Sequence, residues 1–285
     1  MDATKGNGES SSELAVFGGG RGPASVVVNW LHGLSVLWLS VVVFAVMLLV
    51  AAIIFVLVNR LAVGSRAEAF GAVSPGMLPT LGLVFGLLVG FLAAQIWSDG
   101  SSAQQAVARE ASSLRAVVLL SSEFPGTPEA RIKGLVRQQI QDAVTNEWPA
   151  MGRQQANLSV VPVALADLLQ LSLALPTTSP GQAVAQRELV SAVEGALDAR
   201  RQRIIVSESS LNWAKWAALD ALAVLTLLAV GFVHCRNRQT MAIALGLFAL
   251  AEAVCIVALA VQDRPFAGPF RVRPSPLVQV EPAST

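Results

Sequence analysis

The chain has 285 residues, a formal net charge of +1 and a hydrophobic fraction of 54%, while only 14% of its residues are charged. This balance, with a mean hydropathy of +0.59, lies outside the range of soluble domains and indicates an integral membrane protein. The near-zero charge provides no field that would attract nucleic acid, and two cysteines without a Cys-x-x-Cys pair exclude a disulfide framework and a cysteine-based zinc site.

The first part of the chain combines a polar tail with two apolar stretches. Residues 1–25 are rich in Ser and Gly, contain acidic side chains and predict a disordered N-terminal tail. Within 26–97, two runs at roughly 34–58 and 77–97 reach the length of about 20 apolar residues that a helix needs to cross a bilayer. The first run is too long for a signal peptide and follows no basic leader. We therefore expect two transmembrane helices here.

Small residues recur at every fourth position of the second apolar run. This spacing places them on one helix face, where they let two helix backbones approach closely. We interpret the face first as a packing surface within one subunit, with packing between subunits or the lining of a narrow pore as alternatives. The residues are Gly82, Gly86, Gly90 and Ala94.

Residues 98–212 have lower hydropathy and predict a water-facing helical domain. Apolar residues recur at steps of three and four along 107–118, 132–148, 165–173 and 190–204, as is typical of amphipathic helices. Turn residues predict breaks at 125–128, at Pro149 and at 176–181. The domain either begins with a new helix capped by Ser98 or Asp99, or continues the second span without interruption.

A cluster of arginines, Arg200, Arg201 and Arg203, ends this domain next to the membrane. Such a run can bind anions or lipid headgroups. The neighbouring acids Glu194 and Asp198 favour a solvated helix face instead.

Residues 213–262 predict the third and fourth spans, at about 213–232 and 241–261, before a C-terminal tail at 263–285. Each span contains one acid, Asp220 and Glu252. They lie about 17 residues before and about 15 residues after the connecting loop, so their depths are similar. Because a charge in the membrane is costly, we treat both as candidates for an ion or proton pathway, with a structural role as the alternative.

The expected fold is therefore an all-α membrane protein with four transmembrane helices and a helical domain inserted between the second and third. Both termini and the insert then lie on one side of the membrane. The short loops carry Arg60, Arg66, Arg236 and Arg238, which favours a cytoplasmic position for the loops and an extracytoplasmic insert.

Enzyme signatures are absent from the sequence. It contains no phosphate loop, no nucleophile elbow, no His-Glu-x-x-His and no dinucleotide fingerprint. His32 and His234 have no metal-ligand spacing. We expect no enzyme activity, no cofactor and no metal site.

Four stretches of the sequence carry recognisable motifs, at 103–125, at 131–151, at the arginine run and directly after the fourth span. Their residues are Glu147, Trp148, Pro149, Arg200, Arg201, Asp263, Arg264, Pro265, Phe266 and Gly268. These stretches resemble the prokaryotic bestrophin-like family of membrane proteins. The resemblance covers about 34–273 and implies kinship with bestrophins, which are pentameric anion channels with four membrane helices per subunit and a cytoplasmic insert.

Together these observations predict an oligomeric ion channel or ion-sensing protein of a bacterial inner membrane. Its partners would be membrane lipid, further copies of the chain and inorganic ions. The two acids favour a cation or a proton, whereas the resemblance implies an anion, and the resemblance also opposes the loop charges on the side of the insert. The alternative function is a non-transporting scaffold or sensor whose helical insert binds a partner.

Overall fold

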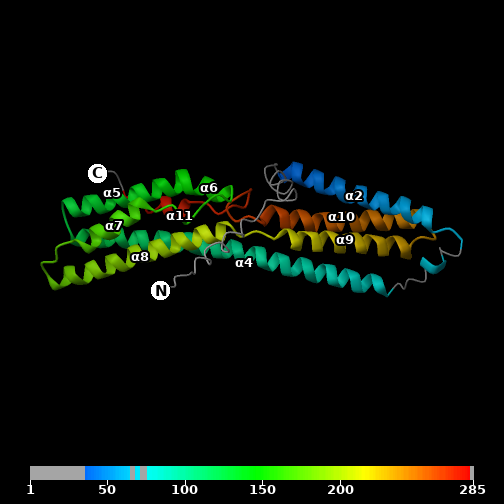
Figure 1. The fold of residues 1–285 in the computed structure, drawn as a ribbon, viewed down its shortest axis with the longest axis horizontal. Helices are drawn as coiled ribbons and strands as arrows, with labels where there is room; N and C mark the ends of the chain where they lie inside the picture. The colour runs from blue at the N-terminus through cyan, green and yellow to red at the C-terminus, as the bar shows by residue number, and fades with distance from the viewer. Residues whose placement is uncertain (1–35, 65–67, 71–75, 283–285) are drawn as a thin grey trace, which may run out of the picture.

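The computed structural model describes residues 36–64, 68–70 and 76–282. The predicted tail at 1–25 and the loop residue Arg66 lie outside these residues. Figure 1 shows two helical bundles placed end to end, with one long helix, α4, running through both. Every regular element in the described residues is helical. The predicted all-α fold is confirmed.

The first bundle contains four helices that are long and apolar enough to cross a membrane. Three of them begin and end close to the predicted positions because hydropathy and the thickness of the bilayer set their lengths, whereas α4 begins at the predicted residue and continues beyond the predicted end. Asn212 and Asn237 cap two of them, each accepting a hydrogen bond from a backbone N–H two residues ahead at 3.3 and 3.0 Å. The helices are α2 (Val36–Leu61), α4 (Met77–Leu120), α9 (Trp213–Val233) and α10 (Arg238–Gln262).

Close packing between α2 and α9 depends on Gly231. A Cβ at this position would lie 3.2 Å from Val58 Cγ2 and 3.3 Å from Ile54 Cγ2. Val58 itself is fully buried. A larger residue at position 231 would therefore push the two membrane helices apart.

Helix α4 resolves the alternative at the membrane boundary, because it continues without a cap at Ser98 or Asp99. Its 44 residues span about 66 Å. The first half belongs to the membrane bundle, whereas the second half packs along α8 and buries Ala103, Val107 and Leu114. The inserted domain is thus rigidly connected to the second span.

The inserted domain is built around the second half of α4. Short turns separate its helices near 121–126 and 174–179, close to the predicted breaks. Gly126 has φ +88°, and the Ser179 hydroxyl caps α8 by accepting a hydrogen bond from the N–H of Gln182 at 3.2 Å. The elements are η1 (Ser121–Glu123), α5 (Thr127–Asp142), η2 (Ala143–Glu147), α6 (Trp148–Gly152), α7 (Val163–Leu173) and α8 (Pro180–Ser207).

The predicted break at Pro149 is wrong. The chain stays helical from Thr127 to Gly152, because the π-helical segment η2 widens the helix directly before the proline. Pro149 lacks an N–H to donate within this helix, and its place directly after the wider π-helical turn lets the helix continue past it. A π-bulge of this kind is frequent at functional sites.

The chain after α10 returns along the inserted domain and contributes to its core. The short helix α11 (Ser275–Val278) contacts α4, and Leu277 and Val280 are buried in the same cluster as Leu114. Arg137 donates a hydrogen bond to the carbonyl of Pro282 at 3.0 Å. Residues 263–282 were predicted to be a C-terminal tail, but they are a folded part of this domain.

Candidate functional site

An ionic cluster lies inside the inserted domain, where three helical segments meet. Arg203 on α8 donates from Nε to Glu110 Oε2 on α4 at 2.7 Å, and neither side chain is exposed. Arg203 also donates to Glu147 Oε2 at 2.6 Å. One guanidinium therefore joins two carboxylates from segments that are distant in the sequence.

Glu147 extends the cluster to a second arginine. Its Oε1 accepts a hydrogen bond from Arg200 Nε at 2.6 Å, and Arg200 also donates to the carbonyl of Val160 at 3.4 Å. Two arginines thus neutralise two carboxylates, and the described partners satisfy both acids. Such a fully paired cluster fixes the relative positions of its helices.

The electrostatics of Arg203 follow from this arrangement. Burial lowers the pKa of Arg203, but the carboxylates of Glu110 and Glu147 outweigh the burial effect and raise the pKa above its ordinary value. The guanidinium consequently stays charged. The cluster is an ion-pair network in which burial raises the pKa of Glu110, while the charge of Arg203 opposes that shift.

Trp148 connects the ionic cluster to the chain after α10. The Arg203 guanidinium carbon lies 4.7 Å from the Trp148 ring centroid, a cation–π contact. On its other sides the indole donates to the carbonyl of Val272 at 3.1 Å and meets the ring of Phe266 edge-on at 5.8 Å. Residues from α6, α8 and the C-terminal segment therefore share one packing unit.

Asp263 lies at the boundary between the inserted domain and the membrane bundle. It follows directly after α10, is buried, and accepts a hydrogen bond from the backbone N–H of Leu211 at 2.7 Å. Burial raises the pKa of Asp263 to about 6, while this N–H and Arg264 oppose the shift. The turn continues with the Val272 N–H donating to the Pro265 carbonyl at 2.8 Å.

The structure corrects the interpretation of the arginine run. A solvated face was expected, but Arg200 and Arg203 are buried at 5% and 0% exposure. Of the run, Arg201 lies on the solvent side, where it meets Asp198 at 3.9 Å. The run spreads over two faces of α8 because positions 200 and 203 are one turn apart, whereas 201 points away.

Glu110 was missed by sequence reasoning, although a signal was present. It lies three residues after Val107 and four before Leu114, on the apolar stripe of the helix. An acid on a buried stripe requires a partner, and Arg203 supplies it.

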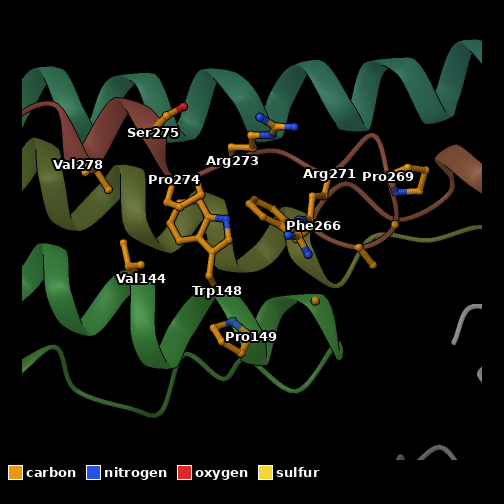
Figure 2. Close-up of a pocket in the computed structure, with 13 residues that line it drawn as sticks. Val144, Trp148, Pro149, Phe266, Pro269, Arg271, Arg273, Pro274, Ser275 and Val278 are labelled. Atoms are coloured by element: carbon orange, nitrogen blue, oxygen red, sulfur yellow. The ribbon is translucent and has the colours of Figure 1, made fainter. Parts of the chain in front are cut away.

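A groove adjoins Trp148 on the surface of the inserted domain. Figure 2 shows it between α6 and the chain that follows α10, with Trp148 and Phe266 at its centre. Gly268, with φ +75°, turns the chain along its edge. The lining residues are Val144, Trp148, Pro149, Gly152, Phe266, Ala267, Gly268, Pro269, Arg271, Arg273, Pro274, Ser275 and Val278.

The two intramembrane acids lie in different surroundings. Glu252 on α10 is 2% exposed, and both of its carboxylate oxygens are buried without a hydrogen-bond partner among the described residues. Asp220 on α9 is exposed on the outside of the helical bundle. The structure therefore places one acid inside the bundle and the other on its outer surface.

The small-residue face of α4 is open. A Cβ added at Gly82, Gly86 or Gly90 would meet no atom within 4 Å, and Ala94 is exposed. Packing within one subunit, the interpretation favoured by spacing alone, does not use this face. An open face is compatible with the two alternatives, packing between subunits and the lining of a pore.

Across the described ranges, no group of three or more His, Cys, Asp and Glu side chains could hold a metal ion. Glu110 and Glu147 serve instead as partners of arginines, and Asp263 accepts a hydrogen bond from a backbone N–H.

Four apolar spans, with an ion-paired helical domain between the second and third, define a multi-pass helical membrane protein. Residues 32–277 match the Bestrophin-like domain family, and the chain belongs to this family. Neither the curated proteins nor the solved structures contain a match.

Proposed function

We propose that the protein assembles into a homo-oligomer in the inner membrane of a bacterium, and that the assembly passes or senses small ions. The open small-residue face of α4 is the observation that carries this proposal. Its partners would be membrane lipid, further copies of the chain and inorganic ions. No catalysis is part of the proposed role.

Helix α4 has the least covered span of the subunit. Within the most apolar 18 residues of each span, 11% are buried in α4, compared with 22%, 39% and 33% in α2, α9 and α10. Lipid can cover large apolar side chains, such as Leu83 and Phe91, without help from protein. A row of glycines is different, because it exposes backbone that packs best against another helix.

Asp220 and Glu252 support a pathway for ions, or a polar contact between subunits, within the membrane-spanning part. Asp220 lies eight positions into the 21-residue helix α9, and an exposed carboxylate at that depth is costly against lipid. A neighbouring subunit or water would remove this cost. Glu252, buried without a hydrogen-bond partner, would bind a proton or a cation more readily than an anion.

Ion flux into liposomes tests the transport role. We expect the reconstituted protein to pass cations or protons faster than empty vesicles do, and Glu252→Gln and Asp220→Asn to change that rate. Glu188→Gln, an exposed acid of the inserted domain, is the matched control and should leave the rate unchanged. Flux equal to that of empty vesicles for the wild-type protein would defeat the channel role.

A second candidate is a scaffold or sensor whose inserted domain binds a protein partner. The loop between α6 and α7 favours it, because this loop and the start of α7 expose four apolar side chains. They are Leu158, Val160, Val161 and Val163, at 48%, 59%, 66% and 61% exposure. The oligomeric mass in mild detergent separates the two candidates, since a strict monomer has no pore between subunits.

A further inference from the structure

The groove beside Trp148 combines apolar walls with unpaired positive charge. Val144 and Val278 lie on its walls, and Arg271 and Arg273 are the charged residues that line it. No acidic side chain belongs to the lining. Its volume of about 1140 Å³ is sufficient for a small organic molecule.

The floor of the groove is rigid. Trp148 is 8% exposed and is held by the carbonyl of Val272, by the Arg203 guanidinium and by the ring of Phe266. Gly152 lets this floor form, because a Cβ there would lie 3.2 Å from the carbonyl oxygen of Phe266. A floor that is fixed before a ligand arrives reduces the entropy cost of binding.

Among the described residues, the two arginines of the groove have no protein partner. Within the residues that the structure describes, neither Arg271 nor Arg273 makes an ion pair or a side-chain hydrogen bond, although Arg200 and Arg203 of the same domain are fully paired. Figure 2 shows Arg271 beside Phe266, and Arg273 extending toward α4. An unpaired guanidinium beside an aromatic floor suits an acid group attached to an apolar body.

We propose that this groove binds an amphipathic organic anion, with its carboxylate or phosphate held by Arg271, its apolar part lying along Trp148, Phe266 and Val278, and Arg273 adding a second positive charge to the lining. The anion can come from two sources. The groove begins at Phe266, four residues after the end of α10, so the headgroup region of an anionic lipid is close. A soluble aromatic acid can enter from the water-facing side of the same domain.

Two measurements on the full chain distinguish these sources. In nanodiscs of neutral phosphatidylcholine, calorimetric titration with 2-naphthoate detects a soluble anion, and the uncharged 2-naphthamide is its control on the wild-type protein. In mixed lipid, native mass spectrometry compares retained phosphatidylglycerol with retained phosphatidylcholine. Neither measurement depends on ion flux, so the binding site and the proposed transport role can fail separately.

We expect the wild-type protein to bind 2-naphthoate or to retain phosphatidylglycerol selectively, and the double variant Arg271→Ala, Arg273→Ala to weaken that binding at least about tenfold, as the loss of a charge-assisted contact implies. Arg131→Ala is the matched control, since Arg131 is exposed on α5 outside the groove. The proposal is overturned if neither probe binds, if 2-naphthamide binds as well as 2-naphthoate, or if the double variant binds like the wild type.

Discussion

The Nε atom of Arg203 lies 2.7 Å from Oε2 of Glu110, and both side chains are fully buried. Glu110 belongs to α4, the helix that also forms the second span, whereas Arg203 belongs to α8, which leads toward the third span. The pair therefore joins the two helices through which the inserted domain is connected to the membrane bundle. Any movement between these helices would have to break a buried ion pair.

Removing Arg203 should destabilise the protein strongly. Arg203→Leu leaves Glu110 and Glu147 close together in a buried site without their shared guanidinium. We expect a loss of about 3–5 kcal/mol in the free energy of unfolding, as for other broken buried pairs. Denaturant titration in detergent, followed by circular dichroism, measures it.

Arg201→Leu on the same helix is the control. Arg201 and Asp198 are 68% and 79% exposed and 3.9 Å apart, so the change should cost less than about 1 kcal/mol. Equal losses for the two variants would mean that the buried pair does not hold the domain together.

Trp148→Phe should loosen the chain that follows α10. Phenylalanine keeps an aromatic ring but loses the N–H that donates to the carbonyl of Val272. We expect faster trypsin cleavage after Arg271, because the unpaired carbonyl favours local opening. Trp213→Phe, at a position 70% exposed, should leave the cleavage rate unchanged. Unaltered cleavage in Trp148→Phe would show that this hydrogen bond does not hold the segment.

Bulky residues on the small-residue face should separate subunits without unfolding them. Gly86→Leu and Gly90→Leu meet open space within one chain, so each subunit should keep its helical content. In an oligomer packed through this face, the same side chains would prevent close approach of the helices. Light scattering in mild detergent should then report the mass of a single chain.

Two other glycines provide controls for that experiment. Gly246→Leu also meets open space, but it lies on α10 and should not change the mass of the assembly. Gly231→Leu would collide with Val58 and Ile54 inside the subunit and should lower stability. An unchanged oligomer in both Gly86→Leu and Gly90→Leu would exclude this face as the interface.

Hydropathy alone predicted the membrane part of the fold, because a span must be apolar along its whole length. The third span was expected at 213–232, and the helix covers Trp213–Val233. The second span was expected to begin at 77, and α4 begins at Met77. The end of α4 was harder to predict, since helical periodicity is the same on both sides of the membrane boundary. Only packing against α8 distinguishes a continuous helix from two helices.

The ionic cluster could be predicted only in part. The arginine run and Glu147 were noted as matching residues, yet their spacing gives no indication that they converge on Glu110, which lies 93 residues from Arg203. Long-range pairing depends on how helices pack, and one sequence does not specify it. The groove could not be predicted either. Residues 263–282 show no strong helical periodicity and were therefore predicted to be a tail, not a wall of a groove.

Stability should depend on pH through Asp263. Its pKa is raised to about 6 by burial, compared with about 3.9 in an unfolded chain. Between these values the folded protein binds more protons than the unfolded chain, so its stability falls as pH rises from about 4 to about 6 and then levels off. A difference of two pKa units corresponds to at most about 3 kcal/mol.

Asp263→Asn isolates this contribution, because an amide oxygen can still accept the N–H of Leu211 but carries no charge. We expect the variant to gain stability relative to the wild type as pH rises from 4 to 7, by up to about 3 kcal/mol. Denaturant titrations at pH 4, 5, 6 and 7 measure the difference, with Asp198→Asn at an exposed site as control. A difference that stays constant over this range would mean that Asp263 is already ionised at pH 4 in the folded protein, and that its hydrogen bond and Arg264 outweigh the cost of burial.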